Sequence, residues 1–132
     1  MKILIVDDDS TSSLFLQGIL KIHGTADIAV NGKEAVTAVE TSLAANEPYN
    51  LICMDILMPE MNGSEAVHKI RQIEILQNIP KEKRVKIMMV TTKADKDTII
   101  SSIQLGADDY IVKPFDGEMI LKKIEKYMRK EN

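Results

Sequence analysis

Short apolar runs alternate with longer amphipathic segments along the whole chain. Each run has the length of a strand, and together they cover residues 2–6, 26–30, 51–54, 85–90 and 109–112. Between the runs, apolar residues recur at the spacing of one helix face. This spacing predicts helices over residues 10–22, from Gly32 through Leu43, over about 63–76, over about 95–105 and from Asp116 through Met128.

Cap and turn residues support these boundaries. Asp9 or Ser10 can cap the first helix, and Gly24 can end it. Pro48 and Pro80 fall in loops, because proline interrupts both helices and central strands. The first helix carries an apolar stripe of Phe15, Ile19 and Ile22, with Leu16 and Leu20 beside it.

Five strand–helix units in this order predict an α/β protein. The strands are apolar almost throughout instead of alternating with polar residues. This pattern indicates a parallel sheet covered by helices on both faces, joined by right-handed crossovers. In open sheets of this kind, ligands bind outside the carboxyl ends of the strands. A functional site is therefore expected at that edge.

Composition narrows the class of protein. The 132 residues suit one domain, which we expect to span residues 1–132 with no output domain. The net charge of −3 gives no electrostatic basis for binding nucleic acid, and no apolar run is long enough to span a membrane. The single cysteine, Cys53, lies in an apolar run and cannot form an internal disulfide. We therefore expect a cytoplasmic protein.

Five polar residues follow the apolar runs directly, at the carboxyl ends of four predicted strands: Asp7, Asp8, Asp55, Thr91 and Lys113. Taken singly, each has an ordinary explanation as a helix cap, a loop acid, a strand end or a solvated lysine. Taken together, three acids, a hydroxyl and an amine at one edge of a sheet predict a site for Mg²⁺ and a phosphoryl group.

The residue types suit this chemistry. Crowded carboxylates repel one another unless a divalent cation is bound, so Asp8 and Asp55 are candidate Mg²⁺ ligands, with Asp7 binding directly or through water. A carboxylate can also act as a nucleophile, which makes Asp55 a candidate for forming an aspartyl phosphate. Lys113 and Thr91 can each hold an oxygen of the phosphoryl group.

Four segments of the chain carry a family resemblance. They read ILIVDDD at residues 3–9, MDILMPEMNG at 54–63, VTTK at 90–93 and GADDYIVKPF at 106–115. In this order they resemble the response-regulator receiver domain, of the CheY-like kind. The resemblance implies a flavodoxin-like (βα)5 fold with strand order 2-1-3-4-5, which makes the first and third strands neighbours.

The resemblance also implies roles for single residues. Asp55 would accept a phosphoryl group from a histidine kinase or phosphotransfer protein. Mg²⁺ would be held by Asp7, Asp8, Asp55 and the main-chain carbonyl of Leu57, while Thr91 and Lys113 would contact the phosphoryl group. Such a protein is a signalling phosphoacceptor and not an enzyme in the usual sense.

In the family, a switch transmits phosphorylation to a protein partner. The resemblance implies that Tyr110 is the aromatic switch residue, which moves with Thr91 and changes the surface of the fourth helix, fifth strand and fifth helix. The Lys113–Pro114 bond would be cis. The protein would be a monomer or a phosphorylation-linked dimer. Leu57 lacks the polar side chain that orients a hydrolytic water in fast-hydrolysing relatives, which predicts slow loss of the phosphoryl group.

Two other functions share parts of this pattern. A haloacid-dehalogenase-type phosphohydrolase would use Asp7 as its nucleophile, within an Asp-x-Asp motif formed by Asp7 and Asp9, and would leave Asp55 without a role. A flavodoxin-like flavin carrier would need a hydroxyl-rich phosphate loop where this chain has three aspartates.

The predicted loop between the third helix and the fourth strand is basic. Residues 77–86 include Lys81, Lys83, Arg84 and Lys86, which form either a solvated loop or a docking patch for an acidic partner.

Overall fold

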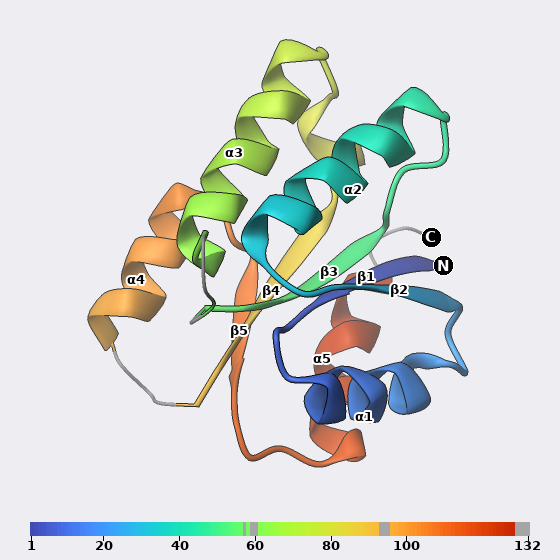
Figure 1. The fold of residues 1–132 in the computed structure, drawn as a ribbon, viewed down its shortest axis with the longest axis vertical. Helices are drawn as coiled ribbons and strands as arrows, with labels where there is room; N and C mark the ends of the chain where they lie inside the picture. The colour runs from blue at the N-terminus through green and yellow to red at the C-terminus, as the bar shows by residue number, and fades with distance from the viewer. Residues whose placement is uncertain (57, 59–60, 93–95, 129–132) are drawn as a thin grey trace.

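A computed structural model describes residues 1–56, 58, 61–92 and 96–128. Its single sheet has five parallel strands in the order β2-β1-β3-β4-β5, which confirms the predicted topology (Figure 1). The strands are β1 (Lys2–Val6), β2 (Thr25–Ala29), β3 (Leu51–Asp55), β4 (Lys86–Thr91) and β5 (Asp109–Val112).

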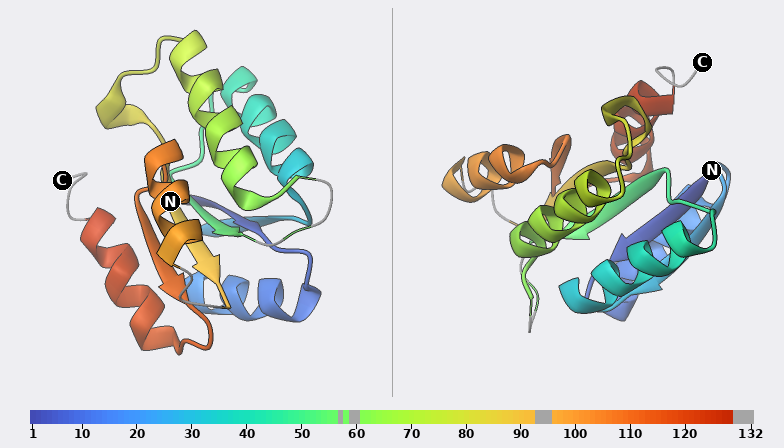
Figure 2. Two further views of the ribbon diagram at one scale, coloured as in Figure 1. Left: turned by 90° about the vertical axis from the view of Figure 1, so that its left-hand side faces the viewer. Right: turned by 90° about the horizontal axis from the view of Figure 1, so that it is seen from above.

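Helices cover both faces of the sheet (Figure 2). Apolar side chains of α2 and α3 pack on one face, and those of α1 and α5 pack on the other. The α4 helix lies beside α3. The helices are α1 (Ser10–Leu20), α2 (Gly32–Ala44), α3 (Gly63–Leu76), α4 (Lys96–Leu105) and α5 (Gly117–Met128), and a short 3₁₀ helix, η1, spans Lys81–Lys83. No helix among the described residues is long and apolar enough to cross a bilayer.

Polar residues fix the helix ends. The side chains of Asp9, Asn31 and Asn62 accept hydrogen bonds from backbone N–H groups in the first turns of α1, α2 and α3. At the other end, α2 and α3 are followed by Asn46 and Asn78, both with φ of 57°. Each asparagine occupies the left-handed position of a Schellman motif, whose hydrogen bonds satisfy carbonyls of the last helical turn.

The first helix differs from its predicted form. It ends at Leu20, two residues early, and Ile22 beyond it is 74% exposed. Leu16 and Leu20 supply its buried face. Phe15 is 51% exposed, and the centre of its ring lies 6.2 Å from the centre of the Phe115 ring. The predicted helical spacing is therefore confirmed, but the apolar stripe that packs on the sheet runs through Leu16 and Leu20 and not through Phe15 and Ile22. The second strand also begins one residue early, at Thr25, and leaves Val30 exposed.

An arginine joins several elements at the amino edge of the sheet. The Arg71 guanidinium lies 2.6 Å from a carboxylate oxygen of Glu74 and 3.0 Å from one of Asp108. It also donates hydrogen bonds to the carbonyl oxygens of Val85 and Gly106. Glu74 is 3% exposed, so its charge depends on this partner. Arg71 thus ties α3 to the start of β4 and to the turn before β5.

Candidate functional site

Three carboxylates meet at the carboxyl edge of the sheet. Asp7 and Asp8 follow β1 and Asp55 ends β3, and these strands are direct neighbours with Val6 opposite Met54. One oxygen from each carboxylate lies within 4.8 Å of the others. Asp7 is buried, Asp55 is half-buried and Asp8 is exposed, so the cluster opens toward solvent on the Asp8 side. An all-oxygen, triply charged set of this size fits a hard divalent cation such as Mg²⁺.

Lys113 brings a positive charge to the cluster. It follows β5, yet its ammonium reaches across the sheet edge to lie 3.0 Å from Oδ2 of Asp7 and 3.4 Å from Oγ of Ser12. Its backbone N–H donates to the carbonyl oxygen of Thr91 at 2.6 Å. The Lys113–Pro114 peptide bond is cis, as the resemblance implied. One ammonium offsets only part of the charge of three carboxylates, which leaves room for a divalent cation.

Thr91 stands beside the cluster. It is the last residue of β4, the strand next to β3, and Asp55 lies opposite Val90 in the register. Thr91 is 5% exposed. The sheet therefore brings Asp7, Asp8, Asp55, Thr91 and Lys113 to one edge, as the sequence predicted. Leu57, the remaining predicted Mg²⁺ ligand, lies outside the described residues.

A glycine lets α3 begin directly against the site. The N–H of Gly63 donates to the carbonyl oxygen of Ile56 at 2.9 Å. A Cβ atom on Gly63 would lie 2.3 Å from the carbonyl oxygen of Asp55, so any other residue would push the helix away from the strand end. One residue on, the hydroxyls of Ser64 in α3 and Ser102 in α4 are 2.9 Å apart. The start of α3 thus contacts both the Asp55 backbone and α4.

Tyr110 lies on the outer strand β5 and is 38% exposed. The ammonium of Lys123 lies 4.9 Å from the centre of its ring and donates a hydrogen bond to its carbonyl oxygen. Ile100 and Ile103 of α4 and Met119 of α5 are also exposed apolar side chains. The predicted switch residue therefore belongs to an outward-facing part of the molecule and not to the carboxylate cluster.

Two serines of the site were missed from the sequence. Ser12 contacts Lys113, and the buried Ser13 donates a hydrogen bond from Oγ to the carbonyl oxygen of Asp7 at 3.4 Å. The sequence held a signal for Ser13, since it precedes Leu16 and Leu20 at helical spacing on the buried stripe. A hydroxyl at such a position needs a hydrogen-bond partner, which here is the backbone of the site.

Cys53 takes no part in this chemistry. It lies within β3 and is buried, and burial raises the pKa of its thiol to about 12. Its thiol therefore stays protonated and is not a nucleophile at neutral pH. The reactive groups at this edge of the sheet are the carboxylates, the hydroxyls and the ammonium.

Comparison with known proteins agrees with this geometry. Residues 3–125 match the family described as the response regulator receiver domain. The chemotaxis protein CheY1 of Helicobacter pylori is 35% identical over 125 residues, covering 95% of this chain and 94% of that protein. The chemotaxis protein CheY of Pseudomonas aeruginosa is 33% identical over 132 residues, covering 100% and 99%.

A solved structure supports the fold. The CheY-like response regulator receiver domain protein from Methanospirillum hungatei superimposes with a TM-score of 0.79 at 32% identity, covering 98% of this chain and 95% of that chain. The match to the family begins within β1, extends over the other four strands and includes the edge on which the acidic cluster lies. The chain belongs to the response-regulator receiver family, whose CheY-like members act in two-component signalling.

Proposed function

We propose that this protein is a phosphorylation switch in which Asp55 accepts a phosphoryl group from a histidine kinase or phosphotransfer protein. The observation that carries the proposal is the meeting of Asp7, Asp8 and Asp55 within 4.8 Å, with Lys113 at 3.0 Å from Asp7. A carboxylate oxygen of Asp55 attacks phosphorus, the bond from phosphorus to the donor imidazole nitrogen breaks, and the imidazole leaves with a proton from solvent.

The hydrogen bonds favour Asp55 over Asp7 as the nucleophile. Oδ1 of Asp7 accepts the N–H of Asp9 at 2.9 Å, and Oδ2 faces the Lys113 ammonium at 3.0 Å. Asp7 is also 3% exposed, so an incoming donor cannot reach it easily. These contacts suit a residue that positions a cation, and they argue against a phosphohydrolase that uses Asp7 as its nucleophile.

Mg²⁺ fits the three carboxylates and, when bound, would shield the repulsion between Asp55 and an incoming phosphoryl group. Asp7, Asp8 and Asp55 would hold it, with the Leu57 carbonyl as a fourth ligand by family resemblance. We propose that Lys113 pairs with a phosphoryl oxygen once that group arrives, and that the hydroxyl of the buried Thr91 holds a second oxygen.

The proposed output is a change on the surface formed by α4, β5 and α5. The start of α3 connects the backbone beside Asp55 to α4, through the Gly63 hydrogen bond to the Ile56 carbonyl and the Ser64–Ser102 contact. The exposed Tyr110 lies on β5, which follows α4 and precedes α5 along the chain, and is the proposed switch residue. A partner protein would bind this surface. We therefore propose that the protein acts as a signalling component and not as an enzyme.

Intact-protein mass spectrometry tests the phosphoacceptor role. The protein is incubated with Mg²⁺ and acetyl phosphate, then measured beside Asp55→Asn and the exposed-residue control Glu40→Gln. We expect one added phosphoryl group on wild type and Glu40→Gln, none on Asp55→Asn, and none when Mg²⁺ is chelated. Equal labelling of Asp55→Asn would move the nucleophile elsewhere and refute the proposal.

The lifetime of the phosphoryl group gives a further prediction. Leucine at position 57 cannot orient a hydrolytic water, so the phosphorylated protein should lose its phosphoryl group slowly. Leu57→Asn is expected to speed this loss, measured as the decay of phosphorylated mass after the donor is removed. An unchanged decay rate would show that another residue controls access of water.

A further inference from the structure

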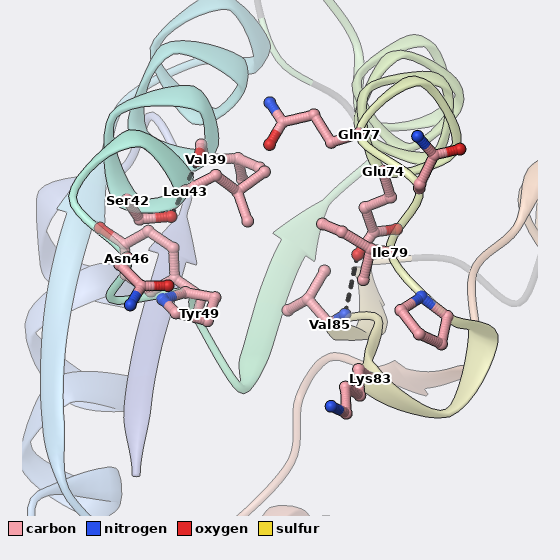
Figure 3. Close-up of a pocket in the computed structure, with 13 residues that line it drawn as sticks. Val39, Ser42, Leu43, Asn46, Tyr49, Glu74, Gln77, Ile79, Lys83 and Val85 are labelled. Atoms are coloured by element: carbon pink, nitrogen blue, oxygen red, sulfur yellow. Dashed lines mark hydrogen bonds between the residues drawn. The ribbon is translucent and has the colours of Figure 1, made fainter.

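A cavity of about 300 Å³ opens at the amino edge of the sheet, between the C-terminal ends of α2 and α3 (Figure 3). Its lining includes the apolar side chains of Val39, Leu43, Tyr49, Ile79 and Val85. Uncharged polar side chains also line it, together with Glu74 of α3 and Lys83 of η1. The cavity is large enough for a side chain of a partner and lies at the opposite end of the strands from Asp55.

Lys83 supplies the available charge in this cavity. The other charged residue of the lining, Glu74, is already satisfied, since Oε1 accepts from Arg71 at 2.6 Å and Oε2 accepts the N–H of Val85 at 2.9 Å. Lys83 has no carboxylate partner among the described residues. A ligand that fits this cavity should therefore carry an apolar group next to a negative charge.

A second cavity, of about 290 Å³, adjoins the first through Val85, which lines both. Its lining carries four basic side chains, Arg71, Lys81, Arg84 and Lys86, and one acid, Asp108. Arg71 is neutralised by Glu74 and Asp108, but the other three have no carboxylate partner among the described residues. Residues 77–86 contain a single acid, Glu82, against four basic residues, in a chain whose net charge is −3.

We propose that these two cavities, with η1 between them, form a docking site for an acidic segment of a partner protein. One apolar side chain of the segment enters the cavity of Val39, Tyr49 and Val85. Its carboxylates lie along Lys81, Lys83, Arg84 and Lys86. We refer to this site as the amino-edge surface. The extent of the basic row favours a polypeptide, because a small carboxylate would need only one of these cations.

This surface provides an interaction independent of phosphorylation. The cluster of Asp7, Asp8 and Asp55 lies at the carboxyl ends of the strands, whereas the cavities lie beside the segments that lead into β3 and β4. A partner could therefore hold the protein at one end while the other end is phosphorylated. Binding at the amino-edge surface is expected to be the same for wild type and Asp55→Asn.

Nuclear magnetic resonance titration tests the proposal. The ¹⁵N-labelled full chain is titrated with an acetylated peptide in which one phenylalanine is flanked by glutamates. We expect shifts centred on the amides of Val39, Leu43, Tyr49 and Val85, weakening as salt is added. A peptide with serine for phenylalanine, and one with glutamines for the glutamates, should each bind at least about tenfold more weakly.

Matched variants assign the site. Lys83→Glu/Arg84→Glu should lower the peptide affinity about tenfold, while Lys21→Glu/Lys33→Glu makes the same charge change elsewhere and should not. Gln77→Phe, which fills the cavity and keeps its charge, should also block binding. Thermal melting confirms that each variant is folded.

Three outcomes would overturn the proposal: shifts confined to other surfaces or absent, equal affinity for the charge-reversed variant, or equal affinity for the glutamine peptide. Phenylacetate is titrated in parallel as a small aromatic carboxylate. If it binds as tightly as the peptide, the site belongs to a small molecule and the protein segment is refuted. Success or failure here leaves the mass measurement on Asp55 unaffected, so the two proposals are tested separately.

Discussion

Removing one carboxylate from the acidic cluster should stabilise the metal-free protein. Asp8→Asn is the cleanest substitution, because Asp8 makes no hydrogen bond or ion pair with another described residue. Its charge faces Asp7 and Asp55, while the Lys113 ammonium lies 3.0 Å from Oδ2 of Asp7. Without a bound metal, Asp8 therefore adds repulsion and no compensating contact.

The size of the effect follows from the distances. Two unit charges at 4.8 Å, the largest separation of these oxygens, repel by about 0.9 kcal/mol in water, which is the appropriate medium for an exposed residue, and salt at physiological strength roughly halves this. The Asp8–Asp55 repulsion exists only in the folded state, while part of the Asp7–Asp8 repulsion persists in the unfolded chain. We expect Asp8→Asn to raise the free energy of unfolding by about 0.5–1 kcal/mol, or roughly 2–3 °C in Tm.

Urea and thermal unfolding in chelator and in excess Mg²⁺ make the prediction decisive. In chelator, Asp8→Asn should be more stable than wild type. In Mg²⁺, wild type should gain stability through metal binding and the variant should gain much less. The difference in stability between the two proteins should therefore shrink or change sign. A variant that is less stable than wild type in chelator, or that gains as much from Mg²⁺, would refute the account of the cluster as a metal site.

Three further predictions concern the frame around the site. Arg71→Met should lower the free energy of unfolding by about 3 kcal/mol in urea titrations, because it leaves the buried Glu74 carboxylate without its cation. Asn78→Ala should cost about 1 kcal/mol, since its φ is 57°, whereas Asn78→Gly should be neutral or slightly stabilising, and equal effects would contradict the left-handed assignment. Cys53 should resist iodoacetamide in the folded protein and react only after unfolding, because burial raises its thiol pKa to about 12; rapid labelling of the native protein would contradict its burial.

The sheet and its functional edge were predictable from local patterns. Apolar runs of strand length and the residues directly after them give Asp55 and Thr91 their places without any knowledge of tertiary contacts. The strand order needed the family resemblance, because the pattern of one strand does not say which other strand it pairs with. Periodicity alone did not determine which helix face packs on the sheet, since in α1 Leu16 is buried and Phe15 is exposed.

Contacts between distant segments could not be predicted. Lys113 and Asp7 are 106 positions apart, and their ion pair depends on how far a lysine side chain reaches over the sheet edge. The role of Arg71 likewise depends on three segments converging, since its partners come from α3, from the residue before β4 and from the turn before β5. The cavity lined by Val39, Tyr49 and Val85 depends on where α2 and α3 end, and the sequence predicts helix ends only to within a few residues.

Direct location of the phosphoryl group tests the central claim. The protein is phosphorylated with acetyl phosphate and Mg²⁺, reduced with sodium borohydride to convert aspartyl phosphate to homoserine, digested, and sequenced by mass spectrometry. The account predicts homoserine at position 55 and at no other aspartate. Homoserine at position 7 would assign the nucleophile to Asp7 and support the phosphohydrolase alternative, and phosphate that borohydride leaves in place would contradict an aspartyl phosphate altogether.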